Sequence, residues 1–275
     1  MMHILMATEG AAHSDVVIRL GAEIARATES TLTILTVIED EGEQPEAEGI
    51  LERAESLVGP AVSGVEVLIR HGAPADTIVT EASEGDYDLA IVGERPLHIL
   101  RRRLFTQTAE KVIAEMPCPI LVARHQSRPL RRFLICESGR DPELLKGLTG
   151  RLAPLLRSAD EVEVLHVMSQ MVAAPGVPGW EIRAEADELM DADTPEGAVL
   201  EHGLESLEEL EALDVRVTAK VRHGMVVEEI LDEATHGDFD VVVVGAHEVS
   251  GWRRLLVDDP VRQILLYGDR PILII

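Results

Sequence analysis

The chain has 275 residues, of which 46% are hydrophobic but only 3% aromatic, and its formal net charge is −25. This length fits two domains of ordinary size with aliphatic cores. The negative charge argues against nucleic acid and anionic lipid as partners, and it predicts either a highly soluble, solvated surface or one that docks a basic protein.

The first half of the chain alternates between predicted strands and helices. Apolar runs predict strands over residues 3–8, 32–38, 65–69, 89–92 and 119–123. Helical spacing and helix-start signals predict helices over residues 14–28, 50–58, from 74 onward and 108–115. We expect an acidic loop over residues 39–48.

The second half repeats this order. Strands are predicted over residues 132–136, 162–167, 215–221, 241–244 and 271–275. Helices are predicted from Pro142, from Pro195 to about residue 213, over residues 226–235 and from Pro260. Residues 169–193 form an extra stretch without a counterpart in the first half. This stretch is either a lid-like segment or a disordered insertion.

A long internal repeat explains the shared order. Residues 70–93 read RHGAPADTIVTEASEGDYDLAIVG and residues 222–245 read RHGMVVEEILDEATHGDFDVVVVG, with 11 of 24 positions identical at an offset of 152. A repeat of this period indicates a duplicated domain. We therefore predict one domain over residues 1–127 and another over 128–275. Strands that are apolar on both faces and alternate with helices predict a parallel sheet covered on both sides.

The predicted architecture places a ligand beyond the carboxyl ends of the strands, at the point where the strand order reverses. The loops after the first strand of each half read Ala7-Thr8-Glu9-Gly10 and Cys136-Glu137-Ser138-Gly139, and the loops after the fourth strand begin at Gly93 and Gly245. Arg101, Arg102 and Arg103 either attract an anion or form a solvated or internally paired face.

The order of these segments, ending in EKVIAEMPCPILVA at residues 110–123, resembles the universal stress protein family twice along the chain. The resemblance implies two tandem, doubly wound, five-stranded parallel-sheet domains of the adenine nucleotide alpha hydrolase-like class. It also implies that the segments Pro119 to Ala123 and Pro271 to Ile275 pair within the chain, and that the chain can form a homodimer.

Family members that bind ATP carry a G-x-x-G-x9-G-[S/T] pattern after the fourth strand and an aspartate at the end of the first. Here the spacing is kept but only the first glycine of each pattern remains. Pro96 and Thr106 replace the other two in the first copy, and Glu248 and Asp258 replace them in the second. Glu9 and Glu137 stand where binders use aspartate.

Two hypotheses describe a cytoplasmic protein without catalytic residues or a metal, and a third, an ATP-hydrolysing or phosphotransfer enzyme, is opposed by the missing glycines and the lack of a catalytic base. The first is a non-enzymatic regulatory or binding protein of the stress response that holds no cofactor. The alternative is a sensor that binds ATP or another adenine nucleotide in its first domain. The candidate nucleotide site comprises Thr8, Glu9, Gly10, Gly93, Arg101, Arg102 and Thr106, and Glu137 and Gly245 would be vestigial counterparts.

Several other residues have a structural explanation in the sequence. Asp86 and Asp88, repeated as Asp238 and Asp240, are typical of a turn that enters a buried strand. His71 and His223 lie at strand ends before a turn. Cys118 and Cys136 follow no metal or redox spacing, so we expect both to be buried as small apolar side chains. The chain lacks an apolar run long enough for a membrane span and a signal-peptide layout at its first residues.

Overall fold

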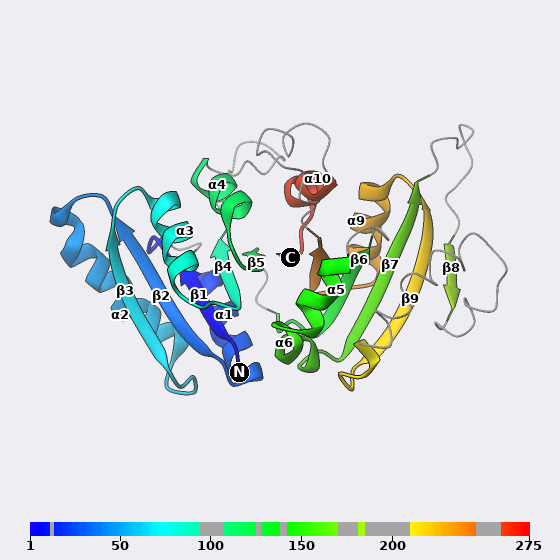
Figure 1. Ribbon diagram of the computed structural model, residues 1–275, viewed down its shortest axis with the longest axis horizontal. Helices are drawn as coiled ribbons and strands as arrows, with labels where there is room; N and C mark the ends of the chain where they lie inside the picture. Colours follow the sequence, from blue (N-terminus) through cyan, green and yellow to red (C-terminus); the bar gives the residue numbers. More distant parts are fainter. Residues whose placement is uncertain are drawn as a thin grey trace. The chain divides into compact units, whose positions relative to one another are not determined.

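The computed structural model describes residues 1–11, 14–93, 107–124, 128–137, 142–169, 181–184, 210–245 and 260–275. The chain divides into two compact units (Figure 1). The first unit contains Met1–Pro129 and Pro271–Leu273, and the second contains Leu130–Arg270 and Ile274–Ile275.

The first unit is a parallel sheet with strand order β3-β2-β1-β4-β5. Its strands are β1 (His3–Ala7), β2 (Thr31–Ile38), β3 (Val65–His71), β4 (Leu89–Gly93) and β5 (Ile120–Ala123). Its helices are α1 (Ser14–Thr28), α2 (Gln44–Val58), α3 (Pro74–Glu84) and α4 (Gln107–Glu115). Figure 1 shows α1 and α2 on one face of the sheet and α3 and α4 on the other. The strand order reverses between β1 and β4.

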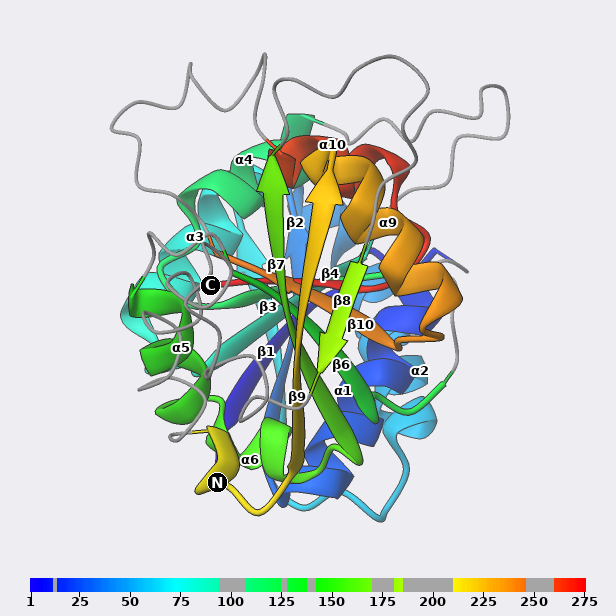
Figure 2. The same ribbon diagram turned by 90° about the vertical axis from the view of Figure 1, so that its right-hand side faces the viewer.

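The second unit has strand order β10-β6-β7-β9-β8. Its elements are β6 (Arg132–Glu137), α5 (Pro142–Thr149), α6 (Ala153–Arg157), β7 (Glu161–Ser169), β8 (Glu181–Ala184), β9 (Arg216–Gly224), α9 (Val226–His236), β10 (Val241–Val244) and α10 (Pro260–Tyr267). A last strand, β11 (Ile272–Ile274), follows. In Figure 2, α9 and α10 lie on one side of this sheet and α5 and α6 on the other. The predicted α/β class with a mostly parallel sheet is confirmed in both units.

The aliphatic cores follow from the alternation of the strands between two covered faces. In β1, Ile4, Leu5 and Met6 are all at most 1% exposed, and the four valines of β10 are at most 3% exposed. A strand buried on both faces needs a continuous apolar run, and both runs have this form.

Three sequence predictions differ from the structure. The helix expected at residues 50–58 begins at Gln44, because Asp40 caps a short 3-10 turn, Glu41–Glu43, and Pro45 then starts α2. The stretch 169–193 contains β8, which pairs antiparallel with β9, whereas we expected no strand there. Cys118 is half-buried rather than buried, and Cys136 is half-buried as a whole residue although its thiol lies in a desolvated environment.

Other predictions fall partly outside the described residues. The helix predicted from Pro195 to about residue 213 lies mostly in the range 185–209, which is one such gap. Among the described helices, none combines the length and the apolar composition that a bilayer span requires.

Candidate functional site

A cleft of about 440 Å³ opens at the carboxyl edge of the first sheet, where the strand order reverses. Its wall is apolar and comes from Val37, Ile78, Val92, Ala109 and Val112. Its polar lining consists of Thr8, Glu9, Ser14, Glu39, Glu43 and Thr108, together with Gly93. A mixed apolar and polar cavity of this size is typical of a small-molecule site.

The end of β1 is fixed at the cleft by hydrogen bonds on both sides of Thr8. The Thr8 backbone N–H donates to the Leu35 carbonyl at 2.9 Å, and the Thr36 hydroxyl donates to the Thr8 carbonyl at 3.2 Å. Gly10 then turns the chain at φ 76° and donates its N–H to Thr8 Oγ1 at 3.2 Å. The position of Glu9 between these two residues is therefore set by the backbone.

Gly93 lines the cleft at the end of β4, at a position where a side chain would not fit. A Cβ atom at this position would lie 2.8 Å from Cγ2 of Val17, which is 1% exposed in the core. Helix α1 therefore packs directly on the β4 backbone. This contact gives a packing reason for the glycine.

Three carboxylates line the cleft, those of Glu9, Glu39 and Glu43, and all three residues are exposed to solvent. Glu43 is held in place by the capping box, since its Oε2 accepts the Glu39 N–H at 3.0 Å and the Asp40 N–H at 3.4 Å. Glu39 and Glu43 follow β2 and were not among the predicted site residues. Their position just after the second predicted strand could have indicated them as site residues, because the end of β2 lies beside the end of β1 in a parallel sheet.

The structure brings together Thr8, Glu9 and Gly93 as predicted lining residues, and Gly10 lies next to them. Arg101, Arg102 and Thr106 fall outside the described residues.

The strand register shows that Glu137 is not the counterpart of Glu9. Ile4 pairs with Leu89 in the first unit, and Phe133 pairs with Val241 at the corresponding position of the second. Glu137 therefore corresponds to Thr8. The counterpart of Glu9 is Ser138, which lies outside the described residues. Gly245 directly follows β10 and is half-buried.

The model of the family described as "Universal stress protein family" matches residues 1–124 and 146–275. The chain belongs to the universal stress protein family. One curated relative, "Universal stress protein in QAH/OAS sulfhydrylase 3'region" from Thermus aquaticus, is 33% identical over 72 residues. That match covers 26% of this chain and about half (53%) of the relative.

Two solved structures share the fold over the whole chain. A universal stress protein from Archaeoglobus fulgidus DSM 4304 is 14% identical with a TM-score of 0.72, covering 99% of this chain and 95% of its own. A putative universal stress protein from Pseudomonas aeruginosa UCBPP-PA14 is 16% identical with a TM-score of 0.68, covering 100% and 92%. The two regions matched by the family model, residues 1–124 and 146–275, show two tandem universal stress protein domains, which account for the repeat.

The second universal stress protein domain carries a buried ionic cluster where the first domain has a simpler pair. Lys220 Nζ lies 2.5 Å from Glu233 Oε2, and the two side chains are 5% and 4% exposed. Arg222 contacts Glu229 at 2.7 Å, Asp232 at 2.8 Å and Glu233 at 3.2 Å. These contacts join β9 to α9. In the first domain, Arg70 on β3 pairs with Glu81 on α3 at 2.7 Å, and Leu68 stands at the position of Lys220.

Two titratable groups of the second domain have shifted pKa values. Burial lowers the pKa of His166, which makes a hydrogen bond with the Glu137 backbone and lies near His223. Burial, with Glu163 and Glu233 nearby, raises the pKa of the Cys136 thiol, so this thiol is protonated near neutral pH. The described residues contain no group of three or more side chains that would hold a metal ion.

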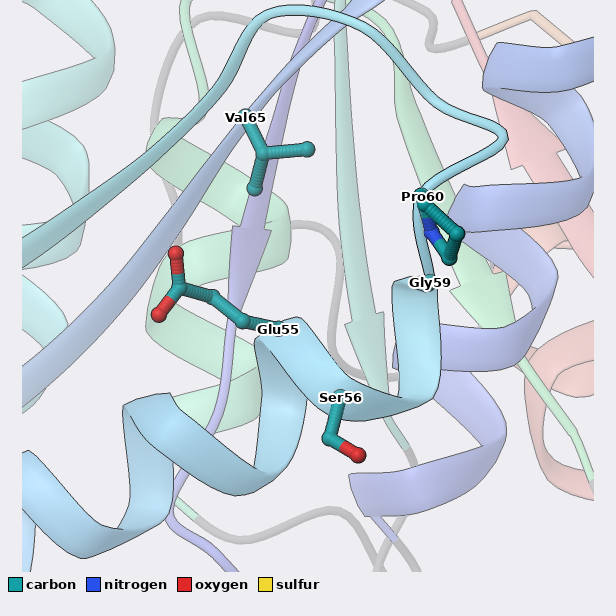
Figure 3. A pocket seen from close by; sticks show the side chains of 5 residues that line it. All are labelled: Glu55, Ser56, Gly59, Pro60 and Val65. Atoms are coloured by element: carbon teal, nitrogen blue, oxygen red, sulfur yellow. The ribbon is translucent and has the colours of Figure 1, made fainter.

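A second hollow of the first domain lies away from the carboxyl edge. Figure 3 shows Glu55 and Ser56 on α2, Pro60 in the following loop and Val65 at the start of β3. Its volume is about 450 Å³. None of the nucleotide-site residues predicted from the sequence lines it.

Proposed function

We propose that this chain is a non-enzymatic binding protein of the stress response whose first domain holds an adenine nucleoside or nucleotide in the cleft. The cleft carries the proposal, because it joins Thr8, Glu9 and Gly93 at the switch point of a parallel sheet. Both copies lose two glycines of the pattern, but in the second copy Glu248 and Asp258 put carboxylates at those positions, which would repel phosphate and so favours the first domain as the binding domain.

The wall of the cleft fits a flat, apolar ring. Val37, Ile78, Val92 and Val112 come from β2, α3, β4 and α4, so a ring between them would contact both the sheet and the covering helices. The hydroxyl and carboxylate groups of the lining can accept hydrogen bonds of the kind that ribose hydroxyl and amino groups donate. An adenosine moiety carries both kinds of donor.

The test fills the cleft with a larger side chain. Val37 is half-buried at the lining, and Val37→Trp is expected to weaken binding of adenosine, AMP, ADP and ATP by at least tenfold in calorimetry. The matched control is Val167→Trp, because Val167 pairs with Arg222 as Val37 pairs with Arg70 and is also half-buried. Circular dichroism checks that both variants are folded.

The control should bind all four compounds as the wild type does. Equal losses in the two variants would contradict the assignment of the ligand to the first domain. If the wild type binds none of the four compounds at up to millimolar concentration, the proposal fails. Hydrolysis of ATP that follows the protein through purification would contradict its non-enzymatic part.

A further inference from the structure

Strand β3 forms the outer edge of the sheet of the first domain (Figure 1). Among the described strands, β2 is the only neighbour of β3. Glu66, Arg70 and His71 are exposed, and the other residues of β3 are half-buried, so the strand is accessible to solvent along its length. An edge strand of this kind presents backbone groups that can pair with a further strand.

The backbone groups on the outer side of β3 belong to its odd-numbered residues. The Leu32 N–H donates to the Gly64 carbonyl at 3.0 Å, so Gly64 points toward β2. Backbone direction alternates from one residue to the next, and the register of β2 with β3 is unbroken from Val65 to His71. The N–H and C=O groups of Val67 and Ile69 therefore point away from β2.

The second domain shows which kind of strand this edge accepts. There β8 pairs antiparallel with β9 at positions that include Ala219 and Val221. By the offset of 152 residues, these two correspond to Val67 and Ile69 of the first domain. The first half of the chain has no sequence counterpart of the stretch 169–193, which supplies β8. The edge of β3 is therefore suited to an antiparallel strand from outside the domain.

The sequence of β3 is complementary to itself in one antiparallel register. With Leu68 at the two-fold axis, Val67 lies opposite Ile69 of a second copy, and each such pair exchanges two backbone hydrogen bonds. Glu66 then lies opposite Arg70 of the second copy on both sides of the axis, and facing residues of opposite charge attract. Registers displaced by two residues lose both charge pairs. A parallel pairing in register would place like charges opposite each other.

The hollow at the start of β3 fits the same register. Val65 lines this hollow together with Glu55 of α2 (Figure 3). In the self-complementary register, Val65 lies opposite His71 of the second copy. Facing residues of an antiparallel pair project from the same side of the sheet, so this imidazole would lie on the side of the Glu55 carboxylate. The hollow leaves room there for a side chain that the second copy supplies.

We propose that the chain forms a two-fold symmetric dimer in which β3 pairs antiparallel with β3 of a second copy. The same edge is used by both copies, so the assembly closes at two chains. None of the seven residues of β3 is among those that line the nucleotide cleft. The proposal is therefore independent of the proposed function.

The test measures the mass of the full chain in solution by sedimentation equilibrium. Two copies that each carry a net charge of −25 repel one another, so the measurement uses about 0.15 M salt, where the Debye length is about 8 Å. Between protein concentrations of about 1 μM and about 1 mM, the range of weak and moderate affinities, the average mass should rise. The expected rise is from 30.0 kDa for one chain toward twice that mass.

Exchanging the charges at two positions tests the register. Glu66→Arg and Arg70→Glu each place like charges opposite each other in a dimer of identical copies. Each variant alone should therefore have a dissociation constant at least about tenfold higher than that of the wild type. An equimolar mixture of the two variants should dimerise as the wild type does, because both facing pairs again carry opposite charges.

Two controls separate this effect from changes in net charge and in folding. Glu84→Arg alters the net charge as Glu66→Arg does, at an exposed position of α3, and should dimerise as the wild type does. Circular dichroism checks that each variant is folded. Arg70→Glu also removes the contact with Glu81, but this loss persists in the mixture, so recovery there would come from the pairing between copies.

Each outcome decides for or against the pairing. Loss in both single variants and recovery in their mixture supports it. A wild type that keeps the mass of one chain at every concentration overturns it. Dimers that both single variants form as readily as the wild type overturn it as well, as does a mixture that fails to recover. A mass that rises beyond two chains indicates an open, head-to-tail contact and overturns the closed dimer.

Discussion

At the scale of single residues, one aspartate in each domain ties the fourth strand of the fold to the first. Asp88 Oδ2 accepts the His3 N–H at 2.9 Å, and the Asp88 N–H donates to the His3 carbonyl at 2.8 Å. Asp240 does the same with two amides, accepting the N–H groups of Arg131 at 3.0 Å and Arg132 at 2.9 Å. The prediction of a turn that enters a buried strand is confirmed for both.

Asp240→Ala should therefore lower the free energy of unfolding by about 2–4 kcal/mol, since it leaves two backbone donors without their charged acceptor. Asp240 is 6% exposed, so water replaces the carboxylate poorly. Asp86→Ala, at an exposed position of the first repeat, should change stability by no more than about 0.5 kcal/mol. Urea unfolding followed by circular dichroism measures both. Similar losses in the two variants would count against the bracing role of Asp240.

His166 gives the second domain a pH-dependent stability. Its pKa in the folded state is lowered by burial below the unfolded value of about 6.5. The unfolded chain therefore binds the proton more readily. The stabilising effect of a neutral His166 is present above pH 6.5 and is lost as the pH falls toward the folded pKa.

The free energy of unfolding of the wild type should drop more steeply between pH 7.5 and 5 than that of His166→Gln. Comparing the two proteins removes the contributions of the other histidines. If the free energy of unfolding depends on pH in the same way in both proteins, His166 does not contribute to the pH dependence of stability.

At the scale of elements, the pair of β9 and α9 differs from the pair of β3 and α3 in how much charge it buries. Lys220 and Glu233 are both at most 5% exposed, whereas Arg70 is 45% exposed opposite Glu81. A buried pair costs desolvation, and removing one partner leaves the other charge in a dry environment. An exposed pair contributes little because water screens it.

Glu233→Leu should cost about 3–5 kcal/mol of stability, because Lys220 loses its closest partner in a buried site. The double variant Lys220→Leu with Glu233→Leu should recover most of that loss, as Leu68 already occupies the position of Lys220 in the first domain. Glu81→Leu, the matched change in the first domain, should cost about 1 kcal/mol or less. Urea unfolding measures the stability of all three variants. A double variant no more stable than Glu233→Leu would contradict the explanation that the loss comes from the charge of Lys220 in its buried site.

At the scale of the whole molecule, local signals predicted the scaffold well. Helix α1 spans Ser14–Thr28 as expected, and α5 and α10 begin at the prolines that the sequence marked, Pro142 and Pro260. The predicted start of α2 was wrong, because a capped 3-10 turn continues into the helix and its residues carry no apolar pattern. Strand β8 was missed because a short edge strand depends on its neighbour β9.

The candidate site was predictable only where it follows strand ends within the repeat. Thr8, Glu9 and Gly93 lie at such ends and meet at the cleft. Val37, Glu39 and Glu43 lie at the end of β2 and reach the cleft through the pairing of β1 with β2. The local sequence around these three residues resembles that of any acidic loop. Only the tertiary structure shows that they line the cleft.

The ionic cluster of α9 also bears on how two homologous halves of one chain avoid exchanging helices while they fold. Misassembly between similar units is a characteristic failure of multidomain and repeat proteins. If α9 docked on β3, Glu229, Asp232 and Glu233 would meet Arg70 and Leu68, a single cation against three carboxylates. If α3 docked on β9, the residues at those three positions would be Thr77, Thr80 and Glu81, one carboxylate for Lys220 and Arg222. The charges therefore favour docking of each helix on its own sheet over the exchanged pairings.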